Sequence, residues 1–124
     1  MFFRKPKKIP ENKREYVRVP SRNLIKITKL DGTEVEKVSN IFDLSESGAR
    51  MICYEKLPVN SVLTMLMLFS EEGSAITVEA KVVWAEPLKE KNASYFTGVV
   101  FIHTSESNSR LIRRFLSALS GSNP

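Results

Sequence analysis

Two short stretches of the chain carry residue types that suit ligand binding. The first contains Arg14 and Arg18, two arginines four residues apart in a basic N-terminal segment. The second runs from Asp43 to Gly48 and combines a carboxylate, the hydroxyl of Ser45 and a glycine between two strand-like runs. An arginine guanidinium can bind two phosphate oxygens at once, or the O6 and N7 atoms of guanine. Together the two stretches suit a compact anionic ligand with purine edges.

The second stretch supplies groups that could contact a purine nucleotide, for which guanine serves as an example. The Asp43 carboxylate can accept hydrogen bonds from guanine N1–H and N2–H, and the Ser45 hydroxyl can donate to a phosphate oxygen or accept from an amino group. Gly48 allows a positive φ, or a close approach of the backbone to a ligand. In an extended segment Arg14 and Arg18 project to the same side, about 13 Å apart at a rise of about 3.3 Å per residue. Two alternatives stay open: a solvated basic tail, and an ordinary β-turn.

The order and separation of these residues resemble the RxxxR and [D/N]xSxxG motifs of the PilZ domain, the bacterial receptor for cyclic di-GMP. The resemblance covers roughly residues 13–119, and residues 82–84 and 97–101 are similar to the late strands of that family. It implies a non-enzymatic receptor without a cofactor. In that family a basic residue before the first arginine goes with a stacked pair of ligand molecules, so Lys13 is a further candidate. The ligand-binding residues that the resemblance implies are Arg14, Arg18, Asp43, Ser45 and Gly48.

The elements that position these residues are predicted to be mainly β-strands. Apolar and polar residues alternate through most of the chain after Asn23, which is the period of a half-buried strand. Asp31 and Gly32 predict a tight hairpin, and residues 43–48 predict a second turn. The apolar run at 62–69 has the length of a strand buried on both faces, and its period alone also leaves a helix open. The predicted strands cover residues 24–30, 33–42, 49–54, 62–69, 76–84 and 95–103.

The pattern changes to a helical period near the C-terminus. The apolar residues there fall on one face at 3.6 residues per turn; they are Leu111, Ile112, Phe115, Leu116 and Leu119. Ser107 or Asn108 is expected to cap the start of this helix, and Gly121 its end. Closure of the six antiparallel strands would remove unpaired edges. The predicted fold is therefore mainly all-β: a six-stranded antiparallel β-barrel with a C-terminal α-helix, as the PilZ resemblance also implies.

The charge of the chain is unevenly distributed. The chain has 124 residues and a net charge of +5, and its length suits one domain. Residues 1–29 hold ten Lys or Arg and two Glu, whereas residues 30–124 carry a net charge of −3. Residues 1–12 are basic and aperiodic, which predicts a flexible lead before a domain at 13–121. Residues 13–22, called the arm below, should enter the fold extended, because Pro20 disfavours a helical Val19.

Several classes of protein do not fit the sequence. No apolar run reaches the ~18 residues of a membrane span, and no signal-peptide pattern is present. The only cysteine, Cys53, is expected to be a small buried residue. These features predict a cytoplasmic protein. No metal-ligand spacing, nucleophile–base pair or Gly-rich phosphate loop occurs, so we expect neither a metal site nor an enzyme. Trp84 is expected in the core or at the barrel rim.

The sequence therefore predicts a cyclic di-GMP receptor whose ligand orders the basic arm on the barrel and changes the surface that a protein partner reads in trans. One alternative is a PilZ-like interaction module that does not bind nucleotide. A second alternative, a nucleic-acid-binding barrel, requires aromatic residues interleaved with basic ones on strand faces. That pattern is not seen, so no nucleic-acid polymer is expected as a partner. A contact between the basic lead and a membrane stays open.

Overall fold

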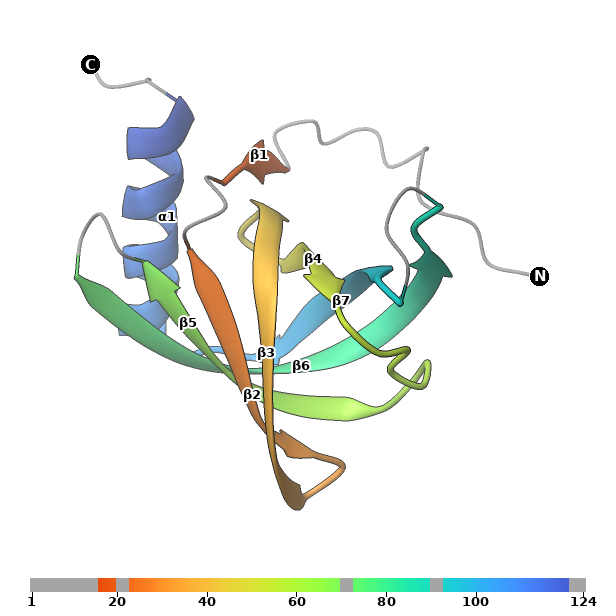
Figure 1. Cartoon of the computed structure of the whole chain (residues 1–124). Coiled ribbons are helices and arrows are strands. Elements are labelled where there is room, and N and C mark those ends of the chain that lie inside the picture. The colour runs from red at the N-terminus through yellow and green to blue at the C-terminus, as the bar shows by residue number, and fades with distance from the viewer. Residues whose placement is uncertain (1–15, 20–22, 70–72, 90–92, 121–124) are drawn as a thin grey trace.

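The computed structural model describes residues 16–19, 23–69, 73–89 and 93–120. Figure 1 shows strongly curved strands with one helix standing beside them. Within the described ranges, no helix has the length and apolar character needed to cross a membrane. In chain order the elements are β1 (Val17–Arg18), β2 (Leu24–Leu30), β3 (Thr33–Leu44), β4 (Gly48–Cys53), β5 (Val62–Phe69), β6 (Ser74–Pro87), β7 (Tyr95–His103) and α1 (Glu106–Ser120).

Six of the described strands close into an antiparallel barrel. They pair in the order β3-β2-β5-β6-β7-β4, and β4 pairs again with β3, which closes the ring. The short strand β1 lies outside the ring and pairs with β3. The six-stranded antiparallel barrel with a C-terminal helix that the sequence predicts is therefore confirmed. Because the barrel is closed, none of its strands is left with the long unpaired edge of an open sheet.

The barrel interior is filled by the inward-facing side chains of the strands, and β5 shows the pattern. Its alternate residues Leu63, Met65, Met67 and Phe69 are buried, whereas the residues between them are partly exposed. The prediction that this apolar strand is buried on both faces is therefore wrong. A strand of an antiparallel barrel packs one face on the core and turns the other towards solvent.

Helix α1 packs its apolar stripe against the barrel. Ile112 and Phe115 are buried, and the Phe115 ring stacks on Phe69 with 4.0 Å between ring centroids. This is the face that the 3.6-residue period predicts. The helix therefore covers core residues that the strands alone would leave open.

The start of α1 differs from the prediction. The helix begins at Glu106, and the Ser105 hydroxyl accepts a hydrogen bond from the Asn108 backbone N–H at 3.1 Å. An N-cap side chain accepts from a backbone N–H two or three residues further on. Ser105 is therefore the cap, and the prediction of Ser107 or Asn108 is wrong. Gly121, expected to close the helix, lies outside the described residues.

A β-bulge at Phe42 sets the direction of the side chains at the end of β3. Ile41 pairs with Met51, but the next paired residue is Asp43, which lies opposite Arg50. A bulge inserts one extra residue into one strand, so the alternation of faces shifts beyond it. Ile41 therefore stays in the core, while Asp43 faces the same outer side as Arg50.

A second bulge, at Val83 in β6, also shifts the alternation of side chains between the two faces of its strand. Val82 pairs with Val99 and Trp84 with Gly98, so one residue is extra. Val82 belongs to the interior core, whereas Trp84 covers Gly98, where an added Cβ would lie 2.4 Å from the indole. Trp84 is buried, as a core residue would be, but against the outer side of the barrel. Both bulges thus turn side chains towards the outer side of β3, β4 and β7.

Candidate functional site

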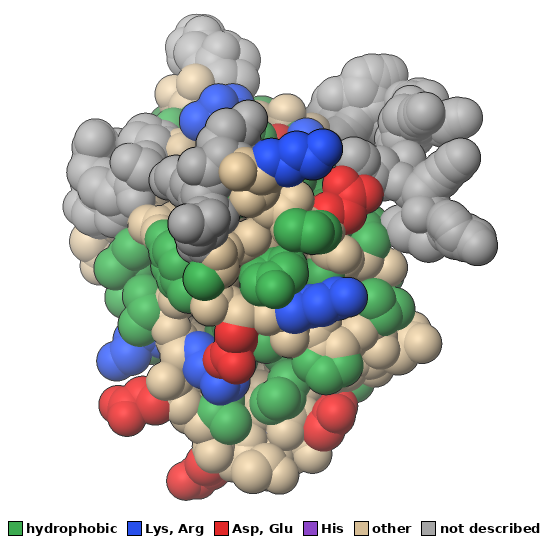
Figure 2. All heavy atoms as spheres, turned by 45° about the vertical axis from the view of Figure 1, so that its right-hand side comes forward, with side chains coloured by type: hydrophobic (Ala, Val, Ile, Leu, Met, Phe, Trp, Pro, Cys, Tyr) green, Lys and Arg blue, Asp and Glu red, His purple; other side chains and the backbone are tan. Residues whose placement is uncertain are grey.

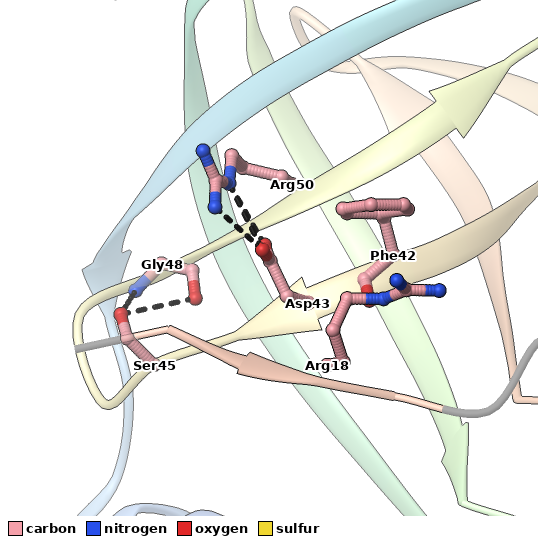
Figure 3. Close-up of polar contacts among 6 residues, drawn as sticks. All are labelled: Arg18, Phe42, Asp43, Ser45, Gly48 and Arg50. Atoms are coloured by element: carbon pink, nitrogen blue, oxygen red, sulfur yellow. Dashed lines mark hydrogen bonds and ion pairs between the residues drawn. The ribbon is translucent and has the colours of Figure 1, made fainter. Parts of the chain in front are cut away.

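The arm and the second motif meet at one corner of the barrel. In the register of β1 and β3, Val17 lies opposite Leu44 and Arg18 opposite Asp43. The backbone N–H of Val19 donates to the carbonyl of Phe42 at 2.9 Å, and the Val19 side chain is buried. The sequence prediction that these two regions lie together is thus met at Arg18 (Figure 3).

Arg18 lies across an aromatic ring at the surface. Its Nε donates to the Phe42 carbonyl at 3.2 Å, and its guanidinium carbon lies 4.0 Å from the centroid of the Phe42 ring. A cation over the face of an aromatic ring is attracted by the negative charge of that face. The contact therefore holds an exposed positive group beside the corner. Arg14 and Lys13, the other predicted basic residues of the arm, lie outside the described residues.

The carboxylate of Asp43 is held by Arg50 in a bidentate ion pair. Arg50 Nε donates to Oδ1 at 2.9 Å, and Nη2 donates to Oδ2 at 2.6 Å. Figure 3 shows the two side chains pointing towards each other from adjacent strands. Burial raises the pKa of the Asp43 carboxyl above its ordinary value, opposed by the hydrogen bonds and charge of Arg50 and the charge of Arg18. Sequence reasoning did not include Arg50.

Two aromatic rings lie near the guanidinium of Arg50. Its central carbon lies 4.6 Å from the ring centroid of Tyr16 and 5.7 Å from that of Phe96. Phe96 meets Phe42 edge-on at 5.1 Å and Trp84 at 5.3 Å between centroids. Figure 2 shows one face of the molecule, on which hydrophobic side chains lie among basic and acidic ones. The sequence motifs contain none of these rings except Tyr16.

The turn between β3 and β4 is shorter than predicted and is organised by Ser45. β3 continues to Leu44 and β4 begins at Gly48, so Asp43 and Gly48 are strand residues. The buried Ser45 hydroxyl accepts from the backbone N–H groups of Ser47 and Gly48 at 3.2 and 3.1 Å. A side chain that bonds its own turn in this way fixes the corner geometry.

Gly48 is required for the packing of the barrel. Its φ is not among the positive values of the described glycines, which are those of Gly32 and Gly73. An added Cβ would lie 2.3 Å from the backbone oxygen of Val99 on β7. The close approach that the glycine permits is therefore to a neighbouring strand. The positive φ that the sequence suggested is not found.

The corner thus presents two guanidinium groups on aromatic faces beside a buried carboxylate. Planar cations of this kind bind phosphate oxygens or guanine edges, and they stack on flat rings. A sequence signal for Arg50 was present: Arg50 is two residues after Gly48, so in a strand the two residues lie on the same face. Its partner Asp43 could not be assigned, because the bulge at Phe42 decides which face Asp43 takes.

Comparison with known proteins agrees with this architecture. The PilZ domain family model matches residues 12–118. The fold is similar to the PilZ domain with c-di-GMP of YcgR from Escherichia coli, with a TM-score of 0.68, 16% identity, and coverage of 86% of this chain and 88% of that one. No curated protein matches the chain.

A second solved structure with the same fold is MrkH of K. pneumonia in its apo state. The TM-score is 0.72 at 19% identity, and the match covers 96% of this chain but 50% of that one. Another MrkH structure, described as a c-di-GMP-dependent transcription regulatory factor, matches with a TM-score of 0.65, 18% identity, and coverage of 87% and 50%. The chain therefore spans half the length of MrkH. The family match and the barrel with its C-terminal helix together show that the chain belongs to the PilZ domain family.

Proposed function

We propose that this protein is a receptor for cyclic di-GMP and binds it between the arm and the β3–β4 corner. The main support is the register of β1 on β3, which places Arg18 directly opposite Asp43. The YcgR domain with the same fold is described with c-di-GMP, which supports the choice of ligand. The receptor is non-enzymatic, because it works by holding the ligand, and acts in the cytoplasm.

Each predicted residue has a role that its chemistry allows. Arg14 and Arg18 bind phosphate oxygens or guanine O6 and N7. Asp43 accepts from guanine N1–H and N2–H, since a carboxylate has acceptor sites beyond those that Arg50 uses. Lys13 contributes charge towards a second ligand molecule.

Two further residues act through the shape of the corner. The Ser45 hydroxyl lies 3.3 Å from the Gly48 carbonyl, and rotation of its hydrogen would let it donate to a phosphate instead. Gly48 keeps β4 close to β7 and so keeps the corner in place. Ser45 and Gly48 therefore hold the surface on which the ligand sits.

Ligand binding changes what the arm contacts. The ligand replaces the Phe42 carbonyl as the hydrogen-bond partner of Arg18, and it orders the arm, residues 13–22, in a new position. A ligand shifts such an equilibrium only if it binds one state of the arm better than the other. A protein partner in trans then recognises the rearranged arm and barrel surface.

Titration calorimetry with cyclic di-GMP, and with GTP as the control ligand, tests the proposal. We expect heat of binding with cyclic di-GMP and little with GTP. Arg14→Ala and Arg18→Ala should each weaken binding by about 1–3 kcal/mol, the scale of a bidentate guanine contact. Arg110→Ala is the matched control, because Arg110 is an exposed arginine on α1 that pairs with Glu106.

Three results would contradict the proposal. Absence of heat with cyclic di-GMP would favour a PilZ-like interaction module that binds no nucleotide. Unchanged binding by both arm variants would place the ligand away from the arm. Dissociation should also accelerate in high salt, because phosphate–arginine contacts are screened; an unchanged rate would exclude such contacts.

A further inference from the structure

Arg50 belongs to neither motif, yet it lies between the corner and the arm. Its guanidinium edge is bound by both oxygens of Asp43, and its central carbon lies 4.6 Å from the centre of the Tyr16 ring. Tyr16 stands midway between Arg14 and Arg18 in the sequence. The corner carboxylate, Arg50 and the arm tyrosine thus form one continuous set of contacts.

The bidentate geometry fixes the plane of the guanidinium. Two parallel N–H···O bonds define the orientation of the Arg50 group, which one hydrogen bond would not do. The side chain is about one-third exposed, at 30%, whereas that of Asp43 is 4% exposed. The buried Asp43 carboxylate therefore holds the Arg50 guanidinium in place, and the guanidinium in turn contacts the ring of Tyr16.

We infer that Arg50 is a positioning residue that docks the arm on the barrel through Tyr16. This part of the inference stands without a ligand. Its consequence for ligand binding rests on the proposed function. Because Arg18 is two residues after Tyr16, docking of Tyr16 on Arg50 also sets the position of Arg18 along β3. Lysine cannot take this role, because an ammonium group is a point charge with neither a bidentate fork nor a planar face.

Amide exchange can report the loss of one contact in the described part of the arm, residues 16–19, because backbone hydrogen bonds tie this segment to β3. Its described backbone bonds include the pairing of Val17–Arg18 with β3 and the bond from the Val19 N–H to Phe42. A cation–π contact of this partly exposed kind changes an equilibrium by roughly threefold to thirtyfold. Loss of the Tyr16–Arg50 contact should raise the population of the undocked arm by that factor.

Amide hydrogen exchange, read by mass spectrometry on the segment Tyr16–Val19, tests the inference. Arg50→Lys and Tyr16→Ala should each speed exchange of this segment by roughly threefold to thirtyfold. Tyr16→Phe keeps the ring and should exchange at the wild-type rate. Arg110→Lys, in an exposed ion pair on α1, is the matched control and should leave the segment unchanged. Exchange of β5 and β6 reports whether each variant remains folded.

The outcomes separate a positioning role from the other roles open to Arg50. Faster exchange in Arg50→Lys and Tyr16→Ala, with the wild-type rate in Tyr16→Phe, supports it. Wild-type exchange in either of the first two variants overturns it. Tyr16→Ala keeps the Asp43–Arg50 pair intact, so its result does not depend on disturbing a buried carboxylate.

Calorimetry with cyclic di-GMP on the same variants tests the consequence for binding. We expect Arg50→Lys and Tyr16→Ala to weaken binding in proportion to their effect on exchange. Weaker binding by Arg50→Lys with an unchanged arm would make Arg50 a direct ligand contact and overturn the positioning role. If the wild type itself gave no heat, the proposed function would fail, while the exchange experiment would still decide whether Arg50 docks the arm.

Discussion

The two ends of the β3–β4 pair both carry polar groups, but the groups differ in charge and surroundings. At the corner end, Asp43 and Arg50 form an ion pair beside the arm. Towards the other end, the buried Ser39 hydroxyl donates to the sulfur of Cys53 at 3.3 Å. A cavity of about 220 Å³ lies there, bordered by residues that include Ile27, Ser39, Cys53 and Leu57.

The charges at that second end lie at the surface. The ion pair of Lys37 and Glu55 has an N–O distance of 2.5 Å, with side chains 29% and 55% exposed. At the corner the carboxylate is buried and both its oxygens are hydrogen-bonded, which fixes the orientation of its partner, whereas a pair with an exposed carboxylate contributes little. Among the described residues, an ion pair with a buried carboxylate, several aromatic faces and the paired strand β1 coincide only at the corner end. A polar cluster thus suits ligand binding where a buried group holds an exposed cation in a fixed orientation, as Asp43 holds Arg50.

The largest expected difference concerns two glycines, Gly48 at the corner end and Gly32 away from it. Gly48→Ala should lower the free energy of unfolding by about 3 kcal/mol, because the new Cβ would overlap the Val99 carbonyl on β7. Gly32, in the β2–β3 hairpin before the start of β3, has φ of 83° and nothing within 4 Å of an added Cβ. Gly32→Ala should cost only about 1–2 kcal/mol of backbone strain. Urea unfolding measures both, and equal losses would refute the packing role of Gly48.

Ligand affinity should respond to the corner end only. Asp43→Asn should weaken cyclic di-GMP binding by about 1–3 kcal/mol, because it removes the carboxylate that accepts from guanine and orients Arg50. Ser39→Ala, at the other end of the β3–β4 pairing, should bind like the wild type. Calorimetry on both variants makes the comparison, and a loss of affinity in Ser39→Ala would show that the two ends are not separate.

Stability should fall at alkaline pH because of Cys53. Burial raises the pKa of this thiol, with a smaller opposing effect from the Ser39 hydroxyl. Above the ordinary thiol pKa of about 8.5, the unfolded chain loses the proton while the folded chain keeps it, which favours unfolding. The wild type should therefore lose up to about 1.4 kcal/mol per pH unit relative to Cys53→Ala. The free energy of unfolding of both proteins is measured by urea unfolding between neutral and alkaline pH. The same dependence on pH in the two proteins would rule out a contribution from the Cys53 thiol.

The smallest effect is expected at the exposed ion pair. Lys37→Gln should lower stability by less than about 1 kcal/mol, because solvent screens exposed charges. The difference from the wild type should shrink further in high salt. Thermal melting at low and high salt measures both effects. A larger loss that persists in high salt would mean that Lys37 supports the cavity wall by packing.

The strands of the barrel could be predicted because their signals are local. The alternation in β2 and the Asp31–Gly32 turn do not depend on distant residues, and both appear as expected. The two-sided burial expected for β5 was wrong, because the composition of one strand does not reveal whether its outer face is covered. The Ser105 cap was missed because the helix begins at Glu106, earlier than the predicted caps Ser107 and Asn108 allow.

The amino-acid sequence by itself determined the family, the barrel and helix, and the presence of an arginine-bearing arm and an Asp-Ser-Gly corner. Period-two patterns, turn residues and short motifs are local properties, so the chain displays them before it folds. The tertiary structure decided that Asp43 pairs with Arg50, that Tyr16 lies on Arg50, and that Trp84 covers the outer side of the barrel. Those contacts depend on bulges at Phe42 and Val83, and a bulge shifts every later side chain to the other face. Strand register is fixed by the packing of the whole barrel, which no single stretch of sequence contains.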